Sequence, residues 1–190
     1  GGGLAASIAS ITDAIKGAGQ VGYNPALAYP ADSIGAAVKS AAADYDSVSA
    51  MLLKTPARSG QRFTTSSFRP GWAATTHGAT GACSYVWNPN RQRSDHNGGT
   101  VISKTAVWDG SEATLAAFLT GASDTAPDGV GCFEASFDGA VFGEWFGMIG
   151  DDATDNVASL KAWVTYTSLY GKTGELGHGR FYQSAKVGSE

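Results

Sequence analysis

The residues that could carry nucleophilic or acid–base chemistry are few in this 190-residue sequence, and they are scattered. The three histidines are His77, His96 and His178. None stands at metal-ligand spacing from another histidine or a cysteine. Ser94, Asp95 and His96 are adjacent and include the residue types of a hydrolase triad. Triads are assembled across a fold rather than from neighbours, so Ser94–Gly99 is predicted to be a turn.

Carboxylates are the second candidate group. Glu134, Asp138 and Glu144 lie near one predicted hairpin and could meet, although the separation of a glycosidase pair is spatial and cannot be read from spacing. Solvated positions at the rim are favoured. We predict no catalytic residue, no cofactor and no metal site in this chain.

An acidic turn precedes the last predicted helix, in the run Gly150-Asp151-Asp152-Ala153-Thr154-Asp155-Asn156. A calcium loop needs more oxygen ligands at alternate positions than this run supplies. We therefore predict that Asp151 and Asp155 accept hydrogen bonds from backbone N–H groups and favour the helix N-terminus, with Thr154 or Asp155 as the cap. A catalytic or metal-binding trio is the alternative.

Aromatic residues could instead form a platform that stacks on sugars. The five tryptophans are Trp72, Trp87, Trp108, Trp145 and Trp163. In a short β module most large aromatic side chains are needed for the core, and the core role is favoured. The two cysteines, Cys83 and Cys132, are predicted to be buried thiols, with a single disulfide as the alternative.

Composition restricts the classes of function. The sequence holds 13 Lys and Arg against 17 Asp and Glu, a formal net charge of −4, with 43% hydrophobic residues and 26 glycines. That content supports a buried core and turn-rich β structure, and the lack of a basic cluster argues against nucleic acid as a partner. No run of 18 apolar residues exists, so no membrane insertion is expected. Gly1–Ser10 resembles no signal peptide, and the missing initiator Met is compatible with a start inside a longer polypeptide.

The elements around these residues fall into three stretches. In the first, Leu4, Ile8, Ile11 and Ile15 are spaced 4, 3, 4, which is a heptad seam of about two heptads. Isoleucine at both core positions favours three or four strands. A helix that packs on its own domain explains the periodicity equally well. A second helical stripe is predicted at Ile34, Val38, Ala41 and Tyr45, continuing or restarting at Val48, Met51 and Leu52 before Pro56.

The middle stretch is predicted to be a mostly antiparallel β module. Its expected strands are 61–68, 82–87, 100–108, 131–137 and 140–146, with a short helix at 112–119. The last two strands are predicted to pair as a hairpin across Asp138-Gly139. In the third stretch, a helix over 155–170 is predicted to bury Val157, Leu160, Trp163 and Val164, and two short strands follow within 175–187.

A family resemblance rests on these motifs. The run Trp145–Val187 resembles the opening of the pectate-lyase-like right-handed β-helix of bacteriophage tailspikes. Matching residues are Trp145, Phe146, Gly147, Gly150, Asp151, Thr154 and Asp155, followed by Leu176-Gly177-His178-Gly179-Arg180-Phe181. Departures from the family pattern are Asp152, Asn156 and Gly177. The small β module that precedes the β-helix in many tailspikes has similar motifs. The matching residues here are 96–102 and Gly131-Cys132-Phe133-Glu134. Gly17–Val38 is similar to connectors behind a virion-anchoring head.

The resemblance implies a mainly β fold with short helices. It implies a helical trimerisation and linker segment over 1–56, a small antiparallel β module over 57–148, and a capping helix with the first rung of a right-handed parallel β-helix over 149–190. The trimer seam would be Leu4, Ile8, Ile11 and Ile15. The β-helix cap would be Asp151, Asp155, Val157, Leu160, Trp163 and Val164.

The implied function is structural: the N-terminal part of a phage tailspike in the virion, assembled in the host bacterial cytoplasm. Its implied partners are two further copies in a homotrimer, the phage tail, baseplate or another tail fibre protein, and bacterial surface polysaccharide through a downstream part. Two alternatives stay open. One is a capsule or O-antigen depolymerase, lyase or hydrolase, with its catalytic site beyond residue 190. The other is a monomeric carbohydrate-binding module that uses exposed tryptophans.

Overall fold

The computed structural model describes residues 44–74, 81–177 and 179–185. They belong to one compact unit, Ala43–Glu190. The predicted seam (Leu4, Ile8, Ile11 and Ile15), the stripe from Ile34 to Ala41, His77 and His178 lie outside the described residues. Residues 44–56, expected with the N-terminal helical segment, contribute a strand and a helix to this compact unit.

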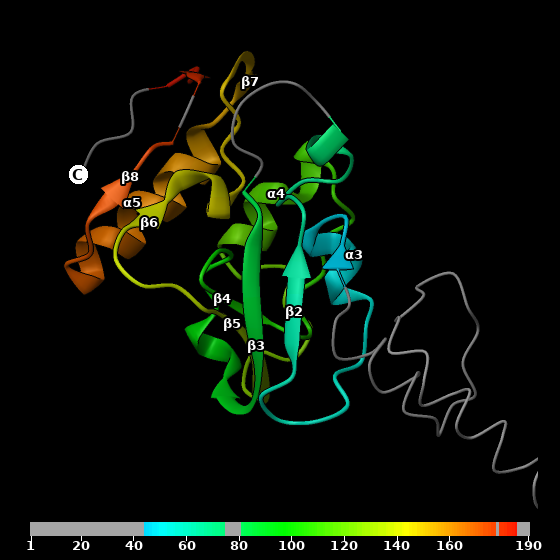
Figure 1. Cartoon of the computed structure of the whole chain (residues 1–190). Helices are drawn as coiled ribbons and strands as arrows, with labels where there is room; N and C mark the ends of the chain where they lie inside the picture. The colour runs from blue at the N-terminus through cyan, green and yellow to red at the C-terminus, as the bar shows by residue number, and fades with distance from the viewer. Residues whose placement is uncertain (1–43, 75–80, 178, 186–190) are drawn as a thin grey trace, which may run out of the picture. The chain divides into compact units, whose positions relative to one another are not determined.

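A five-stranded sheet forms the body of the unit (Figure 1). Its strands are β1 (Asp44–Tyr45), β2 (Arg62–Thr65), β3 (Cys83–Gln92), β4 (Val101–Ser103) and β5 (Val130–Ala135). They lie in the order β1-β2-β3-β5-β4. β1 runs parallel to β2, and every other neighbouring pair is antiparallel. The mostly antiparallel pairing predicted for the middle stretch is therefore present, although only four of its five expected strands lie in this sheet.

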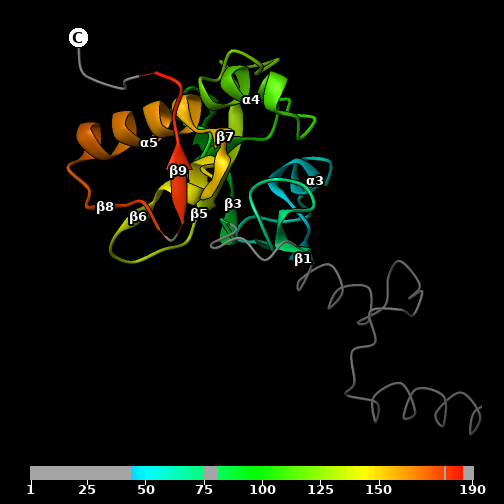
Figure 2. The ribbon, with the colours of Figure 1, turned by 90° about the horizontal axis from the view of Figure 1, so that it is seen from above.

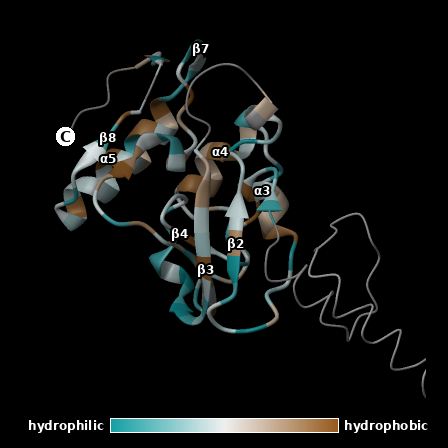
Figure 3. Ribbon diagram, viewed as in Figure 1, coloured by the Kyte–Doolittle hydropathy of each residue, from teal (hydrophilic) through white to brown (hydrophobic). Residues whose placement is uncertain are grey.

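One face of this sheet is buried because side chains alternate along a strand. Phe63 and Tyr85 point from β2 and β3 into the core, each at most 1% exposed, and Ile102 and Phe133 join them from β4 and β5. Hydrophobic segments of the helices gather around this face, whereas hydrophilic colour dominates where β3 runs into the following turn (Figure 3).

In the ranges that the structure describes, three α-helices complete the core. They are α3 (Val48–Leu52), α4 (Glu112–Leu119) and α5 (Val157–Tyr170). Ser47 caps α3, since its hydroxyl accepts a hydrogen bond from the N–H of Ala50 at 3.3 Å. α4 has the bounds predicted from the sequence. Short 3₁₀ helices lie at Trp72–Ala74, Arg93–Asp95 and Gly143–Phe146.

Four further strands form two separate parallel pairs: β6 (Val141–Phe142) with β8 (Gly174–Glu175), and β7 (Asp151–Asp155) with β9 (Arg180–Tyr182). Figure 2 shows β7 beside β9 and β8 beside β6. Parallel strands need a long crossover connection, and here α5 lies within both connections. The two predicted C-terminal strands are confirmed as β8 and β9.

The predicted hairpin across Asp138-Gly139 is wrong. β5 pairs with β3 on one edge and with β4 on the other, so neither edge is left for the next segment. Val141–Phe142 pairs instead with β8, and Gly143–Phe146 turns into a 3₁₀ helix. The sequence could not show this, because the competitor for each edge of β5 lies far away along the chain.

Three smaller predictions also need correction. Tyr45 lies in β1 rather than in a helical stripe. β3 passes through Asn88-Pro89-Asn90 instead of ending there; its register against β5 breaks between Asn88 and Gln92, which places Pro89, with no N–H, inside the irregularity. β4 stops at Ser103 because the chain then turns, with the Thr105 hydroxyl bonded to Asp124 at 2.6 Å.

The fold class is therefore mainly β with few short helices. Within the described part of the chain, no closed rung of a parallel β-helix is present. The division into domains and the β-helix start remain predictions.

Candidate functional site: the layered strand pairs

The two parallel strand pairs place a second layer of chain directly on a first. Val141 pairs with Gly174, and its N–H donates to the carbonyl of Thr173 at 2.9 Å. Asp151 pairs with Arg180, whose N–H donates to the carbonyl of Gly150 at 3.2 Å. The first layer runs β6 then β7, and the second runs β8 then β9 in the same order and direction. This is the arrangement of a chain that coils back on itself once.

The acidic turn orders the first layer. Asp151 Oδ1 accepts hydrogen bonds from the N–H groups of Ala153 (3.0 Å) and Thr154 (2.7 Å), and its Oδ2 accepts the Thr154 hydroxyl at 2.7 Å. Partial burial raises the pKa of Asp151, but these bonds outweigh it and the pKa falls below its usual value. The predicted backbone role of Asp151 is confirmed.

Asp155 ties the start of α5 to the second layer. Its Oδ1 accepts from the N–H groups of Val157 and Ser184, each at 3.1 Å, and its Oδ2 accepts the Ser184 hydroxyl at 2.5 Å. The bonds from Ser184 hold the pKa of Asp155 below its usual value. The predicted backbone role of Asp155 is confirmed too, but the N-cap position itself is Asn156.

Asn156 is the residue that the sequence did not single out for a role. It is 1% exposed, and its side chain forms four hydrogen bonds. The amide oxygen accepts from the N–H of Ile149 at 2.7 Å, and Nδ2 donates to the carbonyls of Ile149, Thr154 and Tyr182. It therefore joins the residues before β7, the start of α5 and the end of β9. Its departure from the family's aspartate was the only signal for it.

Glycines permit the close contact between the layers. A Cβ on Gly174 would lie 2.3 Å from the Trp163 ring, and one on Gly179 would lie 2.5 Å from the carbonyl oxygen of Gly150. Gly179 also has a φ of +124°, a conformation that L side chains rarely adopt. Any larger residue at these positions would push β8 or β9 away from the first layer.

α5 packs over these strands with a different face from the predicted one. Trp163 is 9% exposed and its indole N–H donates to the carbonyl of Val141 at 2.9 Å, so its predicted burial is correct. Val157 and Leu160 are half-buried, whereas Val164 is 38% exposed and its predicted burial is wrong. The buried face includes Ser159 and Trp163. It is therefore displaced around the helix by about one residue from the face that the apolar spacing predicted.

A groove of about 620 Å³ lies between α4, α5 and the turn at residues 94–97. Its walls are mostly apolar, from Leu119, Ala162, Tyr166 and Leu169, with Lys161 among the few charged groups. Leu169 is 72% exposed at this groove.

His96 has a structural role. Its Nδ1 accepts the N–H of Ser103 at 3.0 Å, which assigns the proton to Nε2, and Nε2 donates to the carbonyl of Phe118 at 2.6 Å. Burial lowers the pKa of His96 and favours this neutral form. Asp95 pairs with Arg91 at 2.8 Å. Both ring nitrogens are used, so the run 94–96 forms no triad.

The carboxylates considered for glycosidase chemistry have separate surroundings. Glu134 on β5 accepts from the side-chain amide of Asn88 at 3.1 Å and pairs with Arg91 at 3.4 Å. Glu144 is 2% exposed in the 3₁₀ helix Gly143–Phe146, so the solvated position predicted for it is wrong. Among the described residues no group of three or more His, Cys, Asp or Glu could hold a metal ion.

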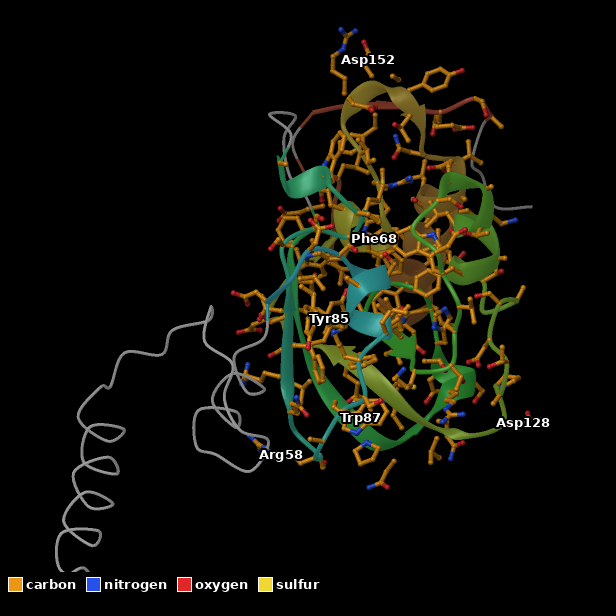
Figure 4. The ribbon with its side chains drawn as sticks, turned by 90° about the vertical axis from the view of Figure 1, so that its right-hand side faces the viewer. Arg58, Phe68, Tyr85, Trp87, Asp128 and Asp152 are labelled. Carbon is orange, nitrogen blue, oxygen red and sulfur yellow. The ribbon has the colours of Figure 1, made fainter. Side chains whose placement is uncertain are left out.

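Most of the tryptophans lie in the core or against it, as predicted. Trp108 and Trp163 are buried in the core, and Trp87 and Trp145 pack against it half-buried. Trp72 is half-buried in the 3₁₀ helix Trp72–Ala74. Figure 4 places Trp87 and Asp152 at opposite ends of the compact unit. Cys83 and Cys132 are free, buried thiols, and burial raises the pKa of each to about 12, which confirms the predicted thiols.

Comparison with known proteins identifies part of this chain. Residues 44–113 match the model of the phage tail protein small four-stranded β-sheet domain. The resemblance to phage tail proteins is thus confirmed over these residues. No curated protein matches the chain. None of the helices in the described ranges has the length and apolar character of a membrane span.

Solved structures give weaker likenesses. Tailspike gp49 of Acinetobacter baumannii bacteriophage Fri1, a capsular polysaccharide depolymerase, has a TM-score of 0.46 at 20% identity, over 67% of this chain and 18% of that one. Tailspike protein 2 of bacteriophage CBA120 has a TM-score of 0.48 at 16% identity, over 81% and 17%. WceF of Pantoea stewartii, a glycan biofilm modifying enzyme, has a TM-score of 0.43 at 16% identity, over 67% of this chain and 14% of that one. The chain thus spans less than a fifth of each.

Proposed function

We propose that this chain is the N-terminal part of a phage tailspike and that its work is mechanical. It trimerises the spike, attaches it to the tail or baseplate, and presents a parallel β-helix that recognises polysaccharide on the host surface. The polysaccharide-binding part, and any depolymerase activity, belong to the spike beyond residue 190. Assembly takes place in the host cytoplasm.

One observation carries the proposal: a phage tail domain continues into two parallel strand pairs stacked in the same order. A coiled chain can repeat this step, since each turn offers its strand edges to the next turn. In the described residues, β8 and β9 each pair with one strand only. Their other edges suit further rungs, and an exposed strand edge needs a partner or protection.

The cap role predicted for α5 gains support from the same region. Trp163 packs on Gly174 and bonds the backbone of β6, so the helix covers the strand pairs. Asp151 and Asp155 fix the turn that leads into it. The end of a β-helix needs such a cover because its hydrophobic interior would otherwise face water.

Light scattering of the purified chain, with a capsule-degradation assay beside it, tests the proposal. We expect a mass near three times 19.4 kDa and no cleavage of polysaccharide. A monomer that cleaves polysaccharide would overturn both halves of the proposal. An inactive monomer would favour the carbohydrate-binding module, which needs no trimer.

A further inference from the structure

The segment Gly143–Ile149, here named the junction, lies in the first layer between β6 and β7 and packs against the phage tail domain. The junction does not have the properties of a hinge. Phe146, Met148 and Ile149 are each at most 5% exposed. Its backbone and side chains are bonded to the elements on both sides.

Arg69 provides the strongest of these bonds. Although it is a charged residue, it is only 8% exposed. Its Nε donates to the carbonyl of Gly147 at 2.8 Å, and its Nη1 forms an ion pair with Glu112 in the first turn of α4. One guanidinium thus holds the tail domain, α4 and the junction together. A charge-assisted, two-way bond of this kind fixes direction as well as distance.

Close contacts add to this bond. The Trp145 indole N–H donates to the carbonyl of Ala82 at 3.2 Å. A Cβ on Gly99 would lie 2.6 Å from the Phe146 ring, and one on Gly147 would lie 2.7 Å from the Phe68 ring. Gly147 has a φ of +85°, which favours glycine. Figure 4 shows Phe68 within the packed interior.

On its other side the junction is tied to α5. The N–H of Ile149 donates to Asn156, and the Phe146 ring lies 5.8 Å from that of Tyr166 on α5. The junction is therefore held by contacts to the tail domain on one side and to α5 on the other.

We infer that Arg69 is the positioning residue of a rigid junction, which fixes the strand pairs to the tail domain in a single orientation. Its relevance for a spike rests on the proposed function: a rigid junction would hold the β-helix at a set angle to the tail rather than let it swing.

A distance measurement tests the inference. Spin labels at Arg62→Cys on β2 and Ser168→Cys on α5 report the orientation, because both positions are exposed. The native Cys83 and Cys132 are buried and resist labelling. Labelled chain is diluted in unlabelled chain, so that only distances within one molecule are seen. The variants are Arg69→Met, which keeps an apolar side chain but removes the guanidinium, and the exposed control Arg58→Met.

We expect one narrow distance distribution for the parent and for Arg58→Met, and a broad one for Arg69→Met. Amide exchange at Gly147–Asn156 should rise at least tenfold in Arg69→Met, while β3 and β5 keep their protection. Arg69→Lys should partly restore the narrow distribution. A narrow distribution and unchanged exchange in Arg69→Met would overturn the inference.

If Arg69→Met does not fold, Glu112→Ala and Trp145→Phe decide. Glu112→Ala removes the ion pair that orients Arg69, and Trp145→Phe removes the bond from the junction to Ala82, each at an exposed or half-buried position. Broadening in either variant supports a rigid junction, and parent-like distributions in both contradict it. The result is independent of the mass measurement. A trimeric mass with parent-like distance distributions in the variants would contradict this inference alone. A monomeric mass with broadened distributions in the variants would contradict the proposed function alone.

Discussion

Single polar residues hold the strand pairs in place, and Asn156 is the clearest case. Its amide group satisfies one N–H and three carbonyls from separate segments, all in a site that water does not reach. A buried polar group left without a partner costs about 1–3 kcal/mol. An amide meets this demand better than a carboxylate does, because it donates and accepts at once.

Asn156→Ala should therefore lower the free energy of unfolding by about 3 kcal/mol, since several buried groups lose their partner together. Urea unfolding followed by tryptophan fluorescence measures it. Asn90→Ala, at an exposed position of β3, is the matched control and should stay within about 0.5 kcal/mol of the parent. Equal effects of the two substitutions would show that the amide network does not hold the layers.

His96 gives the fold a pH dependence of known sign. Burial lowers its pKa in the folded state, although the Phe118 carbonyl and Asp124 act in the opposite direction. The unfolded chain has a histidine pKa of about 6.5 and so binds the proton more readily. Stability should be full above about pH 6.5 and fall as the pH drops below it. Protonation of Nδ1 would also oppose the N–H of Ser103.

Urea midpoints at pH 7.5 and pH 5.5 should thus differ for the parent, and His96→Gln should lose most of that difference. Asp151 and Asp155 do not interfere with this comparison. Their pKa values lie below the usual carboxylate range, so the stability that they add is lost only at more acidic pH. An unchanged pH difference in His96→Gln would assign the effect to other groups.

At the scale of elements, contact between the layers depends on small residues at the crossing points. Gly174 lies so close to Trp163 that an added methyl group must displace either the indole or β8. Overpacking of this kind costs about 1–3 kcal/mol. Because β8 has only two residues and one partner strand in the described part, it should yield before α5 does.

Gly174→Ala should lower stability by about 1–3 kcal/mol and speed protease cleavage within 174–185. Thr173→Ala, one residue earlier and exposed, is the control and should leave both quantities unchanged. Limited proteolysis with mass spectrometry locates the cuts. If cleavage in Gly174→Ala moved to the five-stranded sheet instead, the layers would not be separable from the body of the fold.

Elements whose residues all lie close together in the sequence were predictable. α4 has an uninterrupted helical run and its predicted bounds are correct, and β8 and β9 appeared at the expected places. The hairpin across Asp138-Gly139 failed because its turn signal was local while the edges of β5 were taken by distant strands. In the site, the backbone roles of Asp151 and Asp155 were predictable from turn chemistry. The roles of Asn156 and Arg69 were not, since their partners come from other segments.

At the scale of the whole molecule, the proposed trimer depends on residues outside the described part of the chain. The support for a trimer seam is the spacing of these residues: Leu4, Ile8, Ile11 and Ile15 alternate as core positions of a heptad repeat. A carboxylate buried in such a seam would meet its symmetry copies, and three like charges at one level repel each other in a medium that screens them poorly.

Ile8→Asp combined with Ile11→Asp should therefore reduce the mass in solution from near three times 19.4 kDa to that of one chain. Ser10→Asp adds one such charge off the seam and should leave the mass intact. Near-UV circular dichroism should stay the same in both, since the tryptophans all lie at position 72 or beyond. If the double variant kept the mass of a trimeric parent, the association would come from the folded unit, and the exposed groove between α4 and α5 would be the surface to test next.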